Sequence, residues 1–203
     1  MTPEAFQAIT NVPRGTMDRL HRYAALLAAW QERLNLVAPS TLPLIWERHF
    51  LDSAQLAFHV EAGRRWLDFG SGGGFPGLVL ATMDWGPVTL VEATAKKCRF
   101  LEAVAAELGL THVRVRNARV EALPPAMAEV VTARATAPLA TLFDWSVRHG
   151  GPNARWVFPK GRSWATEVEA ARAAFRFDLD VAESRTDREA RILLVTNLRR
   201  AKH

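Results

Sequence analysis

The hydrophobic positions in the first third of the chain follow a helical repeat. Thr16 is placed to cap a helix, and apolar residues then recur mostly at spacings of three and four. Those that share one face are Leu20, Tyr23, Ala24, Leu27, Trp30 and Leu34. Thr41 is placed to cap a second helix with Pro43 in its first turn, and Gly63 ends the region. Residues 1–63 are therefore expected to form a helical region.

The pattern changes at Arg64, where short β-rich runs begin to alternate with helical stretches. The predicted strands are residues 65–69, 88–92, 113–115, 130–133, 156–158, 177–181 and 192–196. The predicted helices between them are residues 76–83, 95–108, 138–148 and 164–174. This alternation is typical of a parallel sheet covered on both faces. The last two strands have only the turn 184–189 between them, which predicts an antiparallel hairpin at one edge. Residues 64–203 are thus expected to form an α/β domain on which region 1–63 packs.

The composition is that of a folded protein rather than a disordered or membrane-spanning one. Hydrophobic residues make up 49% of the 203 positions and charged residues 23%. Apolar runs such as residues 23–30 are too short to cross a membrane, and the N-terminus carries no basic-then-apolar leader. The single cysteine, Cys98, excludes an internal disulfide and a Cys-rich zinc site. These features predict a protein of the cytoplasm.

The net charge is +5, from 26 Lys and Arg against 21 Asp and Glu. Residues 1–63 hold 5 basic and 6 acidic residues, so the whole excess lies in residues 64–203. A local basic excess is what binding to the phosphates of a nucleic acid requires. Because 22 of the 26 basic residues are Arg, the same excess also fits a solvated surface of an Arg-rich proteome. Charge alone does not separate the two interpretations.

The loop after the first predicted strand is rich in glycine and reads DFGSGGGFPG at residues 68–77. Glycines let a backbone turn sharply and approach a ligand closely, and the following helix presents free N–H groups to it. Gly72, Gly74 and Gly77 match the G-x-G-x-x-G fingerprint of dinucleotide binding. Glu92 follows Gly72 by 20 residues, which is the spacing of the acid that binds a ribose hydroxyl.

A second register of the same glycines predicts a different ligand. Gly70, Gly72 and Gly74, preceded by Asp68, match the first motif of methyltransferases that use S-adenosylmethionine, with Glu92 again on the ribose. An acid just before the loop suits a ligand that carries a cation and repels a pyrophosphate. Asp68 therefore favours the second register over the first.

The segment DFGSGGGFPG resembles the RsmG (GidB) family of 16S rRNA methyltransferases. Further segments that resemble family motifs follow in order: residues 48–53 (RHFLDS), 90–92 (LVE), 96–101 (KKCRFL), 117–121 (NARVE), 132–135 (TARA) and 160–161 (KG). They run from about Trp30 to Gly161 and so cover most of the chain.

The resemblance implies a fold and a reaction. The fold is the Rossmann-like sheet of class I S-adenosylmethionine-dependent methyltransferases, mostly parallel with an antiparallel C-terminal strand, and extended by N-terminal helices. The reaction transfers a methyl group to N7 of a guanine in the 530 loop of 16S rRNA and leaves S-adenosylhomocysteine. The implied partner is the small ribosomal subunit. Guanine N7 carries an in-plane lone pair, so in-line attack needs neither a general base nor a covalent intermediate.

The resemblance and the loop also name candidate site residues. By resemblance, Gly70, Phe75, Val120 and Glu121 contact the cofactor; the loop adds Asp68, Gly72, Gly74 and Glu92. Arg134 is expected to meet either the cofactor carboxylate or an RNA phosphate, the alternative being an ion pair with Asp68. Lys96, Arg119 and Lys160 are expected to hold RNA phosphates, the alternative being solvated charges.

Several further expectations complete the prediction. His49 and Asp52 lie three residues apart on one helix face, but the chain offers too few further ligands nearby for a metal site. Mutual hydrogen bonding, or packing of this helix over the glycine loop, is expected instead. Cys98 is predicted to be a small buried residue rather than a nucleophile. The chain is expected to be a monomer. A methyltransferase with another RNA or small-molecule substrate, and a dinucleotide- or RNA-binding protein, are the alternative functions.

Overall fold

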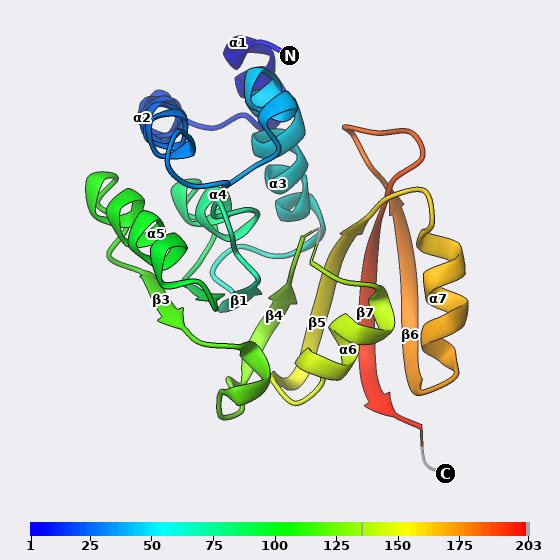
Figure 1. The fold of residues 1–203 in the computed structure, drawn as a ribbon. Helices are drawn as coiled ribbons and strands as arrows, with labels where there is room; N and C mark the ends of the chain where they lie inside the picture. Colours follow the sequence, from blue (N-terminus) through cyan, green and yellow to red (C-terminus); the bar gives the residue numbers. More distant parts are fainter. Residues whose placement is uncertain (135, 202–203) are drawn as a thin grey trace.

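The strands form a single sheet in the computed structural model, which describes residues 1–134 and 136–201 (Figure 1). The order across the sheet is β3-β2-β1-β4-β5-β7-β6. The bounds are β1 (Trp66–Phe69), β2 (Val88–Glu92), β3 (Val113–Asn117), β4 (Ala128–Thr132), β5 (Gly150–Lys160), β6 (Phe175–Glu183) and β7 (Arg191–Arg200). The first five strands pair in parallel, and β7 is antiparallel to both of its neighbours. The predicted fold class and hairpin are confirmed, with β7 placed inside the sheet and β6 at its edge.

Helices cover both faces of this sheet (Figure 1). The α-helices are α1 (Pro3–Thr10), α2 (Arg14–Gln31), α3 (Asp52–Ala54), α4 (Gly77–Thr82), α5 (Ala95–Glu107), α6 (Leu139–Ser146) and α7 (Trp164–Arg172). Short 3-10 helices are η1 (Pro39–Leu44), η3 (Gln55–His59) and η4 (Val120–Ala122), and η2 (Trp46–Leu51) is a π-helical turn. None of the helices in the described part of the chain combines the length and apolar character of a membrane span.

The N-terminal helices differ in detail from the prediction. Helix α1 was not predicted; the Thr2 side chain caps it. Helix α2 starts directly after Pro13, whose extended backbone takes the cap position, so Thr16 lies buried inside the helix instead of capping it. The second predicted helix is a run of η1, η2, α3 and η3, and Thr41 lies within η1. Pro43 inside η1 lacks a backbone N–H, which disfavours a regular α-helix there.

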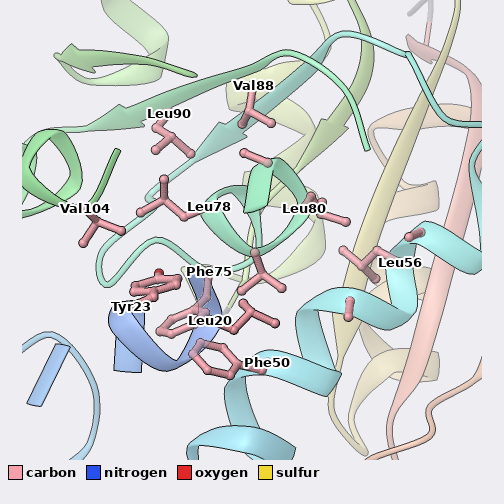
Figure 2. Close-up of a cluster of buried hydrophobic side chains, with 14 of the residues drawn as sticks. Leu20, Tyr23, Phe50, Leu56, Phe75, Leu78, Leu80, Val88, Leu90 and Val104 are labelled. Carbon is pink, nitrogen blue, oxygen red and sulfur yellow. The ribbon is translucent and has the colours of Figure 1, made fainter. Parts of the chain in front are cut away.

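The sheet separates two hydrophobic cores because successive side chains of a strand point to opposite faces. In β1, Trp66 packs into the core beneath α2, α4 and α5, whereas Leu67 and Phe69 pack into the core beneath α6 and α7. Figure 2 shows part of the first core, where Tyr23 of α2 and Phe50 of η2 meet side chains of α4, β2 and α5. The N-terminal helices therefore share a core with the sheet, and their side chains reach the glycine loop.

Candidate functional site

A cavity of about 750 Å³ opens at the carboxyl ends of the parallel strands. It lies beside β1 and β4, where the strand order reverses, which is the usual ligand site of an open α/β sheet. Two groups of residues form separate walls of this cavity. The loop wall consists of residues 70–73, Glu92 and residues 118–121. The ion-pair wall consists of His49, Asp52, Arg134, Lys160 and Glu167.

Two glycines give the loop wall its shape. Gly70 and Gly72 have positive φ angles of 65° and 53°, which residues with a Cβ rarely adopt. A Cβ on Gly70 would lie 2.7 Å from the Thr136 side chain, so the strand-to-loop turn has no room for one. A Cβ on Gly72 would meet no described heavy atom closer than 3.8 Å. The missing side chain of Gly72 therefore leaves space in the cavity rather than in the core.

Glu92 connects the end of β2 to this loop. Its side chain is buried, and its two oxygens accept hydrogen bonds from the backbone N–H groups of Gly72 at 3.0 Å and Thr94 at 2.8 Å. An ionised carboxylate has about four acceptor positions, so both oxygens retain capacity toward a ligand. Glu92 thus lines the cavity and also holds the glycine loop in place.

Asp68 lies behind the loop rather than in the cavity lining. It follows the pleat of Trp66 toward α4, where it is fully buried and its Oδ2 accepts from the Gly77 N–H at 3.2 Å. Its Oδ1 has no hydrogen-bond partner among the described residues. Burial raises the pKa of Asp68 to about 7, against the lowering effect of the Gly77 hydrogen bond. The expectation that this acid faces a cationic ligand is not supported by its position.

Gly74 also lies outside the cavity lining, at a φ of 91°. A Cβ there would collide with the Tyr23 hydroxyl and Leu78, so this glycine is required by packing. The Tyr23 hydroxyl donates to the Gly73 carbonyl at 2.5 Å, and its ring stacks on Phe75 at 5.6 Å. The sequence predicted Tyr23 only as part of the apolar face of a helix. Its helical spacing could not reveal that it supports the loop, because the two segments are 50 positions apart.

Arg134 is held on the ion-pair wall by the N-terminal helical run. Its Nη1 donates to Asp52 Oδ2 at 3.1 Å and to the Arg48 carbonyl at 2.8 Å. Its Nη2 donates to His49 Nδ1 at 2.8 Å, and its guanidinium lies 4.9 Å from the centre of the Phe75 ring. The ion pair considered for Arg134 thus exists with Asp52 instead of Asp68.

His49 and Asp52 do not bond to each other but share Arg134 as a partner. The His49 ring also stacks on Phe75 at 4.8 Å, so this helical run packs over the glycine loop as expected. Burial, together with the charges of Arg134 and Arg48, lowers the pKa of His49 to about 3. The ring is therefore neutral near pH 7. Within the described residues, no group of three or more His, Cys, Asp or Glu side chains is placed to hold a metal ion.

Lys160 is also paired rather than solvated. Its Nζ lies 2.6 Å from Glu167 Oε2 and donates to the Ala137 carbonyl at 3.0 Å. Burial would raise the pKa of Glu167, but hydrogen bonds from Lys160 and the Leu139 N–H hold it below its usual range. Lys160 lines the cavity, yet much of its charge is already neutralised by Glu167.

The remaining predicted residues are divided between the cavity and the surface. Phe75, Val120 and Glu121 line the cavity, and so does the exposed Arg119. Lys96 is exposed and lies outside the lining, which instead includes the half-buried Lys97. Cys98 is buried, as predicted. Of the motif at residues 132–135, residue 135 lies outside the described residues.

The chain matches the model of one protein family over residues 16–191, described as GidB, rRNA small subunit methyltransferase G. The chain belongs to this family. It is 44% identical to ribosomal RNA small subunit methyltransferase G of Parvibaculum lavamentivorans, covering 96% of this chain and 89% of that protein. It is also 44% identical to the protein of that name from Rhodospirillum rubrum, covering 99% and 100%.

Solved structures with the same fold are more distant in sequence. One is a SAM-dependent methyltransferase from Aquifex aeolicus, with a TM-score of 0.58 and 18% identity, covering 80% of this GidB-family chain and 94% of that one. Another is a TehB-like SAM-dependent methyltransferase from Corynebacterium glutamicum, with a TM-score of 0.59 and 12% identity, covering 86% and 99%. At these identities the likeness shows that the GidB-family chain shares their fold.

Proposed function

We propose that this chain transfers a methyl group from S-adenosylmethionine to N7 of a guanine in the small-subunit rRNA, in the 530 loop. The observation that carries the proposal is the loop wall: two glycines with positive φ and a buried glutamate face one cavity at the switch point of the sheet, in a chain of the rRNA small subunit methyltransferase G family. Family membership also favours the methyltransferase register of the glycine loop over the dinucleotide register.

The residues of the cavity fit the cofactor. The volume of about 750 Å³ is within the range of small-molecule sites, about 300–1,000 Å³. Gly72 leaves open space where a side chain would otherwise project, and Glu92 has acceptor capacity for ribose hydroxyls. Val120 supplies an apolar surface for an adenine ring, with Glu121 beside it. Arg134 on the opposite wall supplies a cation for an anionic group.

The chain's contribution to the reaction is alignment and electrostatics. When bound, S-adenosylmethionine supplies a methyl group made electrophilic by its sulfonium. The guanine N7 lone pair is available without deprotonation, so no residue of the chain has to act as a general base. In this proposal the loop wall holds the adenosine part of the cofactor, and the ion-pair wall supplies charged groups to the same cavity. Holding the nucleophile and the methyl carbon in line accounts for several kcal/mol of the barrier, with about 7–11 kcal/mol as the upper range for such effects.

The basic residues around the cavity are proposed to bind the rRNA. Arg119 at the rim and Lys96 outside it are exposed and free to meet phosphates, which makes the affinity sensitive to salt. Lys160 is proposed to act at the cavity itself, where its pairing with Glu167 fixes its position. The assembled small subunit is the proposed substrate and the cytoplasm the proposed location.

The direct experiment transfers labelled methyl from S-adenosylmethionine to small subunits from a strain that lacks this gene. Strand scission specific for 7-methylguanine then locates the product. One cut in the 530 loop is the expected result. Label without a cut contradicts the N7 chemistry but retains the methyltransferase. No label on small subunits or on naked rRNA contradicts the proposed function and returns the loop to the dinucleotide interpretation.

A further inference from the structure

The guanidinium of Arg134 has five N–H donors, and the N-terminal helical run occupies three of them. Nη1 uses both of its hydrogens, on the Arg48 carbonyl and on Asp52, and Nη2 uses one on His49. Within the described residues, the Nε–H and the second Nη2–H make no hydrogen bond. These two N–H groups are the donors of Arg134 that remain for a ligand, and carboxylates and phosphates are the groups that a guanidinium binds most strongly.

A consistent set of hydrogen bonds fixes the His49 ring in one tautomer. Because Arg134 can only donate, His49 Nδ1 must be the unprotonated acceptor. Its Nε2–H then donates to Thr41 Oγ1 at 2.8 Å, and the Thr41 hydroxyl donates to the Ala38 carbonyl at 2.7 Å. The ring is also stacked on Phe75, so it cannot rotate away without breaking that contact.

Asp52 is fixed in the same way by a second segment of the chain. While its Oδ2 accepts from Arg134, its Oδ1 accepts from the Thr186 hydroxyl at 2.8 Å and from Gln55 Nε2 at 3.1 Å. Thr186 lies in the connection between β6 and β7 and also lines the cavity. The carboxylate that holds Arg134 is therefore itself held between the N-terminal run and this connection.

We propose that His49 and Asp52 are positioning residues that hold Arg134 so that its remaining N–H groups face the cavity that it lines, and so create an oxyanion site. This inference rests on the proposed function for the source of the oxyanion, which is either the carboxylate of the cofactor or a phosphate of the RNA. Both are anions whose oxygens accept hydrogen bonds from a guanidinium, so the site would bind them by the same chemistry. The fixed partners reduce the entropy that Arg134 loses when it binds such a group.

Two isosteric variants of His49 separate the positioning role from a structural one. His49→Asn keeps an acceptor oxygen near the place of Nδ1, where Arg134 needs it. His49→Gln reaches toward Thr41 instead and leaves Arg134 without that acceptor. His59→Gln is the matched control, because His59 is half-buried in the same helical run but does not line the main cavity. Thermal unfolding shows whether all three variants are folded.

Calorimetry with S-adenosylhomocysteine and with 5′-methylthioadenosine, which lacks the amino-acid part, identifies the source. If the oxyanion is the cofactor carboxylate, His49→Gln weakens S-adenosylhomocysteine about tenfold or more, His49→Asn weakens it less, and methylthioadenosine is unaffected. If the oxyanion is an RNA phosphate, S-adenosylhomocysteine and 5′-methylthioadenosine bind His49→Gln as they bind the wild type. The affinity of His49→Gln for small subunits then falls, and the slope of log affinity against log salt concentration decreases in magnitude by about 1. Unchanged binding of all ligands, or equal losses for both nucleosides, overturns the proposal.

A measurement on the wild-type chain keeps the proposal testable if the variants do not fold. Nitrogen-15 chemical shifts of the histidine rings are expected to show His49 with a bare Nδ1 and a protonated Nε2. A protonated Nδ1 excludes the hydrogen bond from Arg134 and overturns the inference. If wild-type protein fails to bind S-adenosylhomocysteine, the proposed function fails, whereas the ring-nitrogen result still decides the orientation of Arg134.

Discussion

The loop wall and the ion-pair wall of the cavity are constructed from different groups. The loop wall is shaped by backbone: the positive φ angles of Gly70 and Gly72, and N–H groups held by Glu92. The ion-pair wall is shaped by side chains, with Arg134 on Asp52 and Lys160 on Glu167. Backbone shape depends on residues adjacent in sequence, whereas the partners of Arg134 are more than 80 positions away. The shape of the first wall is therefore readable from one local motif, whereas the contacts of Arg134 in the second wall are not.

The largest expected effect comes from placing a side chain in the loop wall. Gly72→Val puts a β-branched residue at a φ of 53° and fills the open space in front of it. Strain of about 1–3 kcal/mol together with steric exclusion should weaken S-adenosylhomocysteine more than a hundredfold. Calorimetry measures the loss. Gly15→Ala in α2, where a Cβ meets nothing within 4 Å, is the control. Retained binding by Gly72→Val contradicts the assignment of the loop wall.

The next effect concerns the charge buried behind the loop wall. In the unfolded chain the Asp68 carboxyl ionises near pH 4, whereas in the folded chain its pKa is about 7. Between these values folding takes up a proton, so the free energy of unfolding falls as pH rises from about 4 to about 7 and then levels off. The loss is on the order of a few kcal/mol.

Asp68→Asn removes this titration and separates it from other pH effects. Thermal unfolding of both proteins across the same pH range measures the difference. The melting temperature of the wild type is expected to fall relative to that of Asp68→Asn as pH rises toward 7. Parallel curves for the two proteins are incompatible with a raised pKa at Asp68.

A smaller effect is expected from breaking the ion-pair wall at Lys160. Lys160→Ala leaves Glu167 without its cation and the Ala137 carbonyl without its donor, at a cost of about 1–3 kcal/mol in stability. Methyl transfer to small subunits should decrease, while the affinity for S-adenosylhomocysteine changes less than about twofold. Denaturant unfolding, turnover and calorimetry measure the three quantities. A loss of affinity for S-adenosylhomocysteine as large as the loss of methyl transfer would mean that Lys160 contacts the cofactor. It would contradict the separate roles of the two walls.

The smallest effect is expected outside both walls. Lys96 is exposed and lies outside the cavity lining, so Lys96→Ala should lower the affinity for small subunits by less than about tenfold. The slope of log affinity for small subunits against log salt concentration should decrease in magnitude by about 1 at most in this variant. Arg14→Ala, at the start of α2, is the control with an equal change of charge. An effect of Lys96→Ala on cofactor affinity contradicts this placement.

The contrast between the walls also explains which parts of the molecule could be predicted. Strand β2 was predicted with its observed bounds, Val88–Glu92, and the start of α5 at Ala95 was predicted as well, because both follow from local apolar spacing. Helix α1 was not predicted, although its start carries the Thr2 cap followed by Pro3 and Glu4. The site of Asp68 was misread because the motif shows that an acid precedes the loop but not to which face of β1 it points.

The partners of the basic residues could not be predicted for a different reason. Asp52 and Arg134 become neighbours only when the N-terminal helical run packs over the end of β4, and Tyr23 reaches Gly73 only through the shared core. Neither contact leaves a local pattern in the sequence. The sequence therefore identified the residues that line the cavity better than the contacts that orient them.

A crystal structure with S-adenosylhomocysteine bound would show which wall of the cavity holds which part of the ligand. The adenosine is expected against the loop wall, with its ribose hydroxyls on Glu92 and its ring on Val120. Adenosine located on the ion-pair wall, or a ribose with no contact to Glu92, would contradict this arrangement.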